Sequence, residues 1–436
     1  PRKPRQGAIR HEIRAGIGNR GQRSLDFDSS GSISERLAYR IDASAERGDG
    51  WVDRGKHSSQ GLTGALQWQF LPRWQLQLSH AEGRHKPMRY FGVPLIDGKP
   101  LEALRRTNYN VQDARITFRD HWSELTLQGS PSDNIAVRSR LYHIRSNRLW
   151  FDAENYTWDE VRQQIRLAGD TAIRHHQKQT GNTTDVTFDS KLLGMDNTIS
   201  AGFDLNHSSL QHDNNTYSGN PRYVSLLSPE TGFFDSDVPF IPRYRNTADQ
   251  YALFVEDRLA VTGQLSLVAG LRHDRVRIRR DDLITGSRAF SRTWNSTGHR
   301  LGAVYALTPT LSVYAQHSRA ADPSTAPLMM SASGAKADMT IGRQIEVGIK
   351  QSLPQQHGEW TLAAYNITKH NLQSRDPANP DNSIQVGKQS SRGIEGTLSL
   401  ALSSTLRLDA DATVLRARYD DFNDAVDGAI VSRSGN

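Results

Sequence analysis

The histidines are the residues whose type and spacing come nearest to metal-binding chemistry. His175 adjoins His176, and His207 and His212 follow further along the chain. Neither pair has a carboxylate or a further histidine at the spacing that zinc or non-haem iron sites use. We therefore predict no metal site and expect these four histidines in solvated loops or at strand ends. The chain has no cysteine, which also excludes thiolate ligands, disulfides and cysteine nucleophiles.

The sequence carries no motif of a common catalytic centre. It contains no G-x-S-x-G nucleophile elbow, no H-E-x-x-H and no glycine-rich phosphate loop. An enzyme is therefore the least supported class, and we expect neither catalytic residues nor a cofactor. The formal charge is +7, but its positive charges are scattered among acids, which argues against a nucleic-acid partner.

The composition is polar for a chain of 436 residues. Only 36% of them are hydrophobic, and no stretch approaches the about 18 uninterrupted apolar residues that a membrane-spanning helix needs. A very polar soluble protein would fit this composition. A β-barrel would fit it equally, because its strands need apolar residues only at alternate positions.

Apolar and polar residues alternate with a period of two in several segments. Examples are 198–206, 265–271, 345–350 and 406–414. The period predicts strands with one apolar face, whereas a helix would spread the same charges around every side. In a barrel wall the charged face of the last example, with Arg407, Asp409 and Asp411, must point to the lumen, since an arginine on the lipid face costs roughly 2–4 kcal/mol.

Short turns alternate with long loops between these strands. The short turns are 71–73, 131–133, 261–263, 307–309 and 402–404, and the long stretches are 83–121, 208–244, 320–340 and 371–387. Tight turns at one rim and long loops at the other are typical of an up-and-down barrel. If each membrane-crossing strand has about 10 residues, roughly 17 strands are expected.

Four aromatic residues stand at strand ends beside short turns. Trp68 and Phe70 precede the turn at 71–73, Trp74 follows it, and Trp360 comes just after Gly358. Aromatic rings at such positions form the girdle of a membrane barrel, at the boundary between hydrocarbon and water. The alternative is that they fill the end of a soluble sheet.

Several short segments, read in order along the chain, carry a family resemblance. They resemble the barrel of TonB-dependent outer-membrane siderophore receptors, which import ferric chelates into Gram-negative bacteria. The matching segments are DQYALFVED at 249–257, LSLVAGLRHDR at 265–275, LSVYAQHS at 311–318, Glu346-x-Gly348-x-Lys350, WTLAAYNI at 360–367 and RGIE at 392–395, with the loop-like YFGVP at 90–94 and LRRTNYNV at 104–111.

The resemblance implies an all-β fold, a transmembrane antiparallel up-and-down β-barrel of the 22-stranded type with about 17 strands present. Residues 1–6 resemble the end of the family's plug domain and its linker. Residues 7–436 then form the barrel, which is incomplete at its C-terminus. The family's plug and the box that contacts TonB are missing from this sequence, and TonB binding is expected through that N-terminal region.

The resemblance also implies that ligand is held at the extracellular mouth by loops. Rings pack on the apolar faces of a ferric chelate and arginines pair with its negative charge, so aromatic and cationic loop residues are candidate contacts. They are Tyr90, Phe91, Arg105, Arg106 and Tyr109 in one loop, Trp150 and Trp158 in the next, and Tyr217, Tyr223, Phe233, Phe234 and Tyr244 in the longest. Packing within the loop is the alternative role for each. Iron arrives inside the siderophore, so no protein-bound cofactor is expected.

The expected partners are a ferric siderophore, TonB, and the lipid and lipopolysaccharide of the Gram-negative outer membrane. Two other functions remain open. A passive porin has a comparable wall and an open polar lumen, and a soluble β-rich binding protein such as an adhesin has similar strands. The long, aromatic-bearing loops favour the receptor over the porin.

Overall fold

The computed structural model describes residues 3–216, 220–322, 327–353, 357–375, 383–385, 387–426, 429–432 and 434–435. Strands make up nearly all of its regular structure. The described helices are three 3-10 turns, η1 (Glu102–Leu104), η2 (Pro327–Met329) and η3 (Gly334–Lys336). No helix in these ranges has the length and apolar character to cross a membrane.

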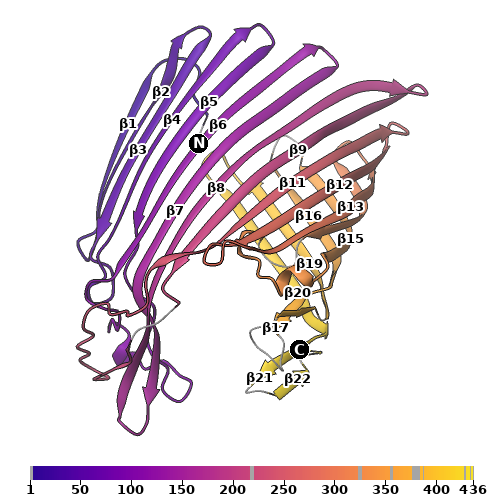
Figure 1. The fold of residues 1–436 in the computed structure, drawn as a ribbon. Coiled ribbons are helices and arrows are strands. Elements are labelled where there is room, and N and C mark those ends of the chain that lie inside the picture. Colours follow the sequence, from indigo (N-terminus) through magenta and orange to yellow (C-terminus); the bar gives the residue numbers. More distant parts are fainter. Residues whose placement is uncertain are drawn as a thin grey trace.

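One antiparallel sheet of 18 strands dominates the structure and curls into an open trough (Figure 1). The three-residue β10 lies among the loops, so the wall itself has the 17 strands predicted (18 less β10). The strands of the sheet are β1 (Arg10–Ile17), β2 (Arg23–Ser34), β3 (Leu37–Gly48), β4 (His57–Leu71), β5 (Trp74–Lys86), β6 (Arg115–Ser132), β7 (Ile135–Asp159), β8 (Gln164–Leu192), β9 (Met195–Asn214), β10 (Arg222–Val224), β11 (Ile241–Ala260), β12 (Leu265–Asp282), β13 (Arg288–Ala306), β14 (Leu311–Asp322), β15 (Thr340–Leu353), β16 (Gly358–His370), β19 (Lys388–Ala401) and β20 (Arg407–Asp421). Two small hairpins, β17 (Gln373–Arg375) with β18 (Ser383–Gln385) and β21 (Asn423–Val426) with β22 (Ala429–Ser432), lie outside it.

The two rims of the trough differ as the sequence predicts. Short turns join β4 to β5, β6 to β7, β11 to β12, β13 to β14 and β19 to β20, and long connections gather at the opposite rim, which is at the bottom of Figure 1. The long connection at 371–387 has the predicted bounds, and the other three are shorter than expected. The loop predicted at 83–121 spans 87–114, because the alternation continues through β5 and β6 beyond the ends assigned from sequence.

The sheet has two free edges in the described part of the chain. β1 pairs only with β2, and β20 pairs only with β19. A wall in hydrocarbon requires partners for both edges, because unpaired backbone groups cannot reach water there. The incomplete barrel and its boundaries at residues 6 and 7 stay a prediction.

The register gives the wall one apolar face. Phe203 and Leu253 are cross-strand partners on β9 and β11, and Ala201, Val255 and Leu271 form the next row, which reaches β12. Leu253 is 67% exposed, and Val255 and Leu271 are exposed as well. The polar residues between them point to the concave side, as predicted for Arg407, Asp409 and Asp411, which alternate with outward residues such as Leu408. The outer face is therefore an apolar band suited to lipid.

The aromatic residues expected in the girdle lie at the short-turn end of this band. Trp68 is half exposed and its ring centroid lies 5.6 Å from that of Phe70. Trp74 covers Gly129 on the neighbouring strand. The indole of Trp360 donates a hydrogen bond to the Gln351 side chain at 2.8 Å. Amphipathic rings at this level fit a boundary between hydrocarbon and water.

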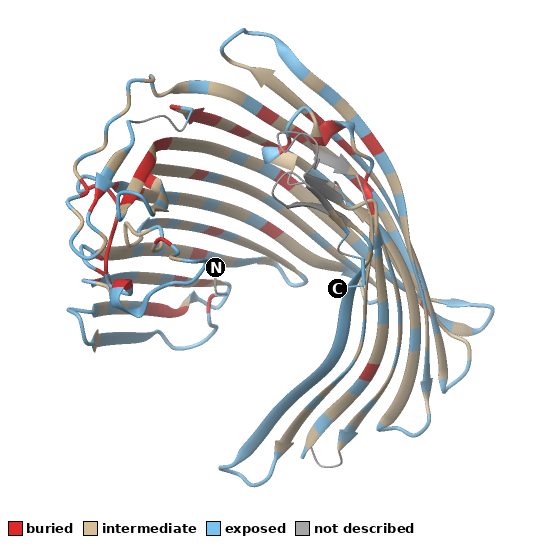
Figure 2. Cartoon of the chain, turned by 90° about the horizontal axis from the view of Figure 1, so that it is seen from below, coloured by how far each residue is buried: buried red, intermediate tan, exposed pale blue. Residues whose placement is uncertain are grey.

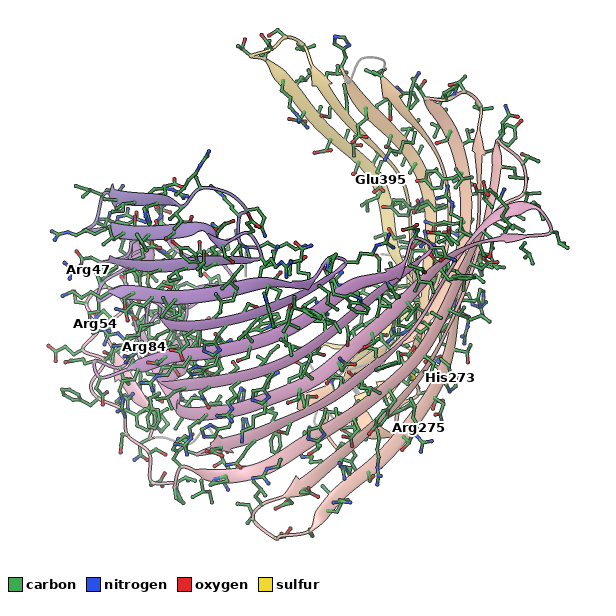
Figure 3. All side chains as sticks on the ribbon, turned by 90° about the horizontal axis from the view of Figure 1, so that it is seen from above. Arg47, Arg54, Arg84, His273, Arg275 and Glu395 are labelled. Carbon is green, nitrogen blue, oxygen red and sulfur yellow. The ribbon has the colours of Figure 1, made fainter. Side chains whose placement is uncertain are left out.

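Basic residues follow the other end of the apolar band. We call them the outer polar belt; Figure 3 labels four of its members, Arg47, Arg84, His273 and Arg275. By register its cations and histidines include Arg47, His80, Arg84, His121, His143, Arg145, His207, His273, Arg275, His299, His317, Arg319, Arg343, Arg392 and Arg416, with Glu82 and Asp249 among them. This belt separates the apolar band from the long loops.

An arginine placed in the apolar band tests the assignment of the two faces. We expect Leu253→Arg to destabilise the folded protein in lipid by about 2–4 kcal/mol, because its charge meets hydrocarbon. Glu256→Arg, on the opposite face of the same strand, serves as the control and should cost far less. Urea titration of the protein in lipid vesicles measures both. Equal losses in the two variants would contradict the assignment.

Candidate functional site

Three connections at the long-loop rim pack together into a cap, comprising residues 49–56, 87–114 and 220–240. The Arg54 guanidinium donates to the backbone oxygens of Asn108 at 2.8 Å and Asn110 at 2.7 Å. The Asn108 side-chain amide donates to the backbone carbonyl oxygen of Asp53 at 2.8 Å. The backbone N–H of Gln112 donates a hydrogen bond to the carbonyl oxygen of Gly232 at 2.9 Å, which joins the second connection to the third. The loop cap is thus held by its own polar network.

The loop cap also contains a hydrophobic core, and buried residues gather at this end of the molecule (Figure 2). Tyr109, Ile165, Leu167 and Val224 form one buried cluster. The Tyr109 hydroxyl donates to the Leu226 carbonyl, and burial raises the pKa of Tyr109 to about 12. A phenol in such a position acts as a packed anchor for the loops.

Two predicted ligand contacts belong to this core. Tyr109 is fully buried, and Trp158 packs against the cluster that contains it. In this conformation both rings have the alternative role, packing within the cap. Phe234 behaves similarly, because its ring lies 5.1 Å from that of Phe151 and its backbone N–H is bonded to Asp113.

The expected loop location is wrong for Trp150, Trp158 and Tyr244. The first two lie on β7 and Tyr244 lies on β11. The β7–β8 hairpin has strands of 25 and 29 residues, far longer than a membrane crossing of about 10 residues requires. Its pairing continues past the outer polar belt, so residues expected in a loop are held rigidly on a sheet.

A ladder of rings crosses the concave face just inside the long-loop rim. Its members come from consecutive wall strands, β5 to β9 and then β11, and an arginine of β12 closes it. The centroid separations are 6.1 Å from His85 to Phe118, 5.2 Å to Trp150, 5.3 Å to His175, 4.9 Å to His212 and 4.7 Å to Tyr244, with the Arg280 guanidinium 3.5 Å from the Tyr244 centroid. We call this row the ring ladder. It joins predicted contacts Trp150 and Tyr244 into one surface.

Cations flank the ring ladder, and burial lowers the pKa of two of its histidines, His175 and His212. The Arg148 guanidinium lies 4.7 Å from the Phe118 ring centroid. His175 and His212 share a hydrogen bond of 2.8 Å between Nε2 and Nδ1. Burial, followed by the charges of His175 and Arg280, lowers the pKa of His212 to about 4. The row therefore offers π faces beside positive charge, which suits a flat anionic ligand.

The histidines differ from their predicted setting. All four lie within strands. His212 is near the end of β9, as the prediction of loops or strand ends allows, but it is only 4% exposed. His207 is exposed, as expected, but pairs with Asp249 at 2.6 Å. His175 Nε2 and His212 Nδ1 are hydrogen-bonded to each other, and these are the two nitrogens that an ion held between the rings would need. Strand pairing of β8 with β9 brings these two distant residues opposite one another, which spacing along one segment cannot reveal.

The remaining candidates are on the surface of the loop cap. Phe91, Arg105, Arg106, Tyr223 and Phe233 are exposed, and Tyr90 contacts Trp51 edge to face at 5.2 Å. Arg105 and Arg106 line a hollow together with Arg20, Trp51 and Glu102. Tyr217 lies outside the described residues. A second cationic and aromatic surface is therefore present at the mouth.

Sequence reasoning missed Phe118, His85 and Arg280 of the ring ladder and Trp51 of the hollow. The period-two pattern does carry a signal for the ring ladder. Alternate residues of a strand share a face, so the inward-facing residues of each strand could have been counted onward past the end of the membrane crossing. Which inward residues meet across strands depends on register, and the sequence pattern alone does not fix it.

A buried acid lies beneath the loop cap. Asp152 has no exposed surface, and neither carboxyl oxygen has a hydrogen-bond partner among the described residues. It lies on β7 beyond His143 and Arg145 of the outer polar belt. Burial, then the charges of Glu154 and Asp170, raises the pKa of Asp152 to about 7. Asp170, by contrast, is paired with Arg222 through both oxygens, at 2.8 and 2.9 Å.

We predict that Asp152 makes the loop cap less stable as pH rises. A carboxyl with a raised folded-state pKa stabilises the fold fully below its ordinary pKa of 3.8, and this contribution is lost as pH increases through about 7. Asp152→Asn should abolish the loss and protect the cap at pH 8 by up to about 4 kcal/mol. Hydrogen exchange of residues 87–114, corrected for the intrinsic rate at each pH, measures it.

Asp170→Asn is the matched control, because it removes one partner of a buried ion pair and should destabilise the cap at pH 8. If Asp152→Asn lowers protection at pH 8 as Asp170→Asn does, the carboxylate has a stabilising partner and the prediction is wrong.

A family model for the TonB-dependent receptor-like β-barrel matches residues 89–435. The chain belongs to the TonB-dependent receptor β-barrel family. Barrels of this family are receptors in the outer membrane of Gram-negative bacteria, and the apolar band and outer polar belt described above fit that location.

Named relatives share this assignment at low identity. The metal-pseudopaline receptor CntO of Pseudomonas aeruginosa PAO1 is 24% identical over 428 residues, which cover 90% of this chain and 56% of that protein. The ferrioxamine B receptor of Salmonella typhimurium LT2 is 23% identical, over 94% of this chain and 58% of that protein. The chain thus spans just over half the length of these curated relatives.

Solved structures of siderophore receptors have the same fold. PiuA from Acinetobacter baumannii superposes with a TM-score of 0.85 at 15% identity, covering 99% of this chain and 67% of that one. The ferripyoverdine receptor of Pseudomonas aeruginosa, solved with ferripyoverdine bound, gives a TM-score of 0.77 at 18% identity, covering 96% and 57%.

Proposed function

We propose that this chain is the barrel portion of a receptor for ferric siderophores and that its role is binding and transport without catalysis. The ring ladder is the observation that supports this most directly. It places six neighbouring rings, one from each of six wall strands, and a guanidinium at the entrance to the lumen, directly inside the loop cap.

The chemistry of the ring ladder matches such a ligand. A ferric chelate presents apolar faces and often a net negative charge, which rings and arginines accommodate together. Because the ladder residues sit on paired strands, their rings are ordered before ligand arrives and little side-chain entropy is lost on binding. The ligand would first contact the hollow at Arg105 and Arg106 and would then reach the ring ladder further inward.

Transport against a gradient requires energy, which we propose is supplied through TonB. In this family the contact is made by a segment N-terminal to the barrel. A passive porin would need no such partner, so TonB dependence separates the two functions.

We further propose that the outer polar belt contacts lipid and lipopolysaccharide of the outer leaflet. The belt follows directly on the apolar band, where lipid phosphates lie. Arginines such as Arg145, Arg319 and Arg343 present charge to that layer, and phosphate is a preferred partner of the guanidinium group.

Removing rings from the ring ladder tests the ligand. We expect Trp150→Ala and Tyr244→Ala each to weaken binding of a ferric trihydroxamate, with ferrioxamine B as the probe, by about 5-fold or more, since a buried ring contact is worth about 1 kcal/mol or more. Trp68→Ala, which removes a ring from the lipid face, should leave it unchanged. Tryptophan fluorescence quenching of the purified protein measures affinity.

Uptake of iron-55 with the same probe completes the test. Uptake should require both this gene and a functional TonB. If it continues undiminished without TonB, the barrel is a passive pore. If a panel that also includes catecholate and pyoverdine-type chelates neither binds nor enters, the proposed function is wrong.

A further inference from the structure

A cluster on the lipid side of the wall, remote from the lumen, has the composition of a metal site. His80 and Glu82 lie two residues apart on β5, and His121 is the cross-strand partner of Glu82 on β6. Residues two apart on a strand point to the same face, and a directly opposed residue joins them there. Their three ligating atoms all lie within 4.8 Å of one another.

The two separations from the carboxylate agree with tetrahedral coordination. Glu82 Oε1 lies 3.4 Å from His80 Nε2 and 3.3 Å from His121 Nδ1. Zn²⁺ binds nitrogen and carboxylate oxygen at about 2.0–2.2 Å, which puts neighbouring ligands of a tetrahedron about 3.3–3.5 Å apart. Both histidines thus approach one oxygen at the separation that an ion between them would impose.

The surroundings of His80 support the same interpretation. Its other ring nitrogen, Nδ1, lies 2.8 Å from the Ser123 hydroxyl. Metal-binding histidines almost always donate their second N–H to an oxygen, which fixes the ring and its tautomer. With Nδ1–H donating to Ser123, the lone pair on Nε2 faces Glu82 and is available to a cation.

Other histidines of the outer polar belt lack this combination. His143 contacts Thr180 and Arg145, and His299 stacks on His317. Asp249 beside His207 also receives the Arg279 guanidinium at 2.9 Å. Within the described residues, the cluster on β5 and β6 is the one group of three or more histidines and acids close enough to share an ion.

We propose that His80, Glu82 and His121 bind a divalent transition-metal ion of the Zn²⁺ type on the outer wall. Two imidazoles and a carboxylate suit such ions, and three protein ligands leave a coordination position open to water. His80 and Glu82 are exposed and His121 is half-buried, so an ion reaches the site without entering the lumen. The site is independent of the ferric siderophore proposed above.

The test uses the protein expressed from its own gene, purified in detergent and stripped with chelator. Titration with Co²⁺ should produce the visible absorption of a tetrahedral ion, and Zn²⁺ should displace it. His80→Gln, His121→Gln and Glu82→Gln should each weaken Zn²⁺ binding by at least about 100-fold, and Ser123→Ala by about 10-fold. Calorimetry at pH 7.5 gives the affinities.

His143→Gln is the matched control, since it removes a histidine from the same face one strand away. It should leave the affinity unchanged. Heat-modifiable migration in detergent shows that each variant is folded, and the three ligand variants are scored separately. The proposal is overturned if the wild-type protein shows no saturable Zn²⁺ binding, if folded Glu82→Gln binds as tightly as wild type, or if His143→Gln loses as much affinity as His80→Gln.

Discussion

The structure depends on one constraint, the continuous antiparallel hydrogen-bond ladder between neighbouring strands of the wall. A strand in hydrocarbon has no water to satisfy its backbone groups, so every N–H and C=O must find a partner in the next strand. The ladder fixes register, and register fixes which residues share a face. A shift of one residue on β11 would turn Leu253 into the lumen and Phe254 and Glu256 toward lipid.

The same ladder extends beyond the membrane and organises the mouth. The β7–β8 hairpin continues past the outer polar belt, and it gives the loop cap a rigid base on which to bury Tyr109, Ile165 and Leu167. Hydrophobic cores therefore occur under the loops, while the wall is a single layer between two environments. The ring ladder lies where the single-layer wall meets the loop cap. Strand pairing holds its residues in place, and the loops lie next to it.

Much of this architecture could be predicted from sequence because it depends on local patterns. Period-two alternation predicts the strands and the inward direction of Arg407, Asp409 and Asp411, and turn residues predict the short rim. Aromatic residues such as Trp68 and Trp360 mark the boundary of the apolar band. Each of these signals comes from residues adjacent in the chain.

The site was less predictable because it depends on pairings between distant residues. His175 and His212 meet through the register of β8 and β9, and His121 meets Glu82 through that of β5 and β6. Tyr109 illustrates a second limit, since an aromatic residue in a polar loop has the same sequence signature whether it binds ligand or anchors the loop. Burial decides between these roles, and a single sequence does not contain it.

The alternation of two environments along one strand is the central claim, and the absence of cysteine makes it directly measurable. Spin labels attached to single cysteines introduced in turn at 251–256 report collisions with oxygen, which concentrates in lipid, and with a water-soluble nickel chelate. We predict that the labels at 251, 253 and 255 favour oxygen and those at 252, 254 and 256 favour the chelate. Uniform accessibility along the segment would contradict the assignment of β11 to a membrane wall.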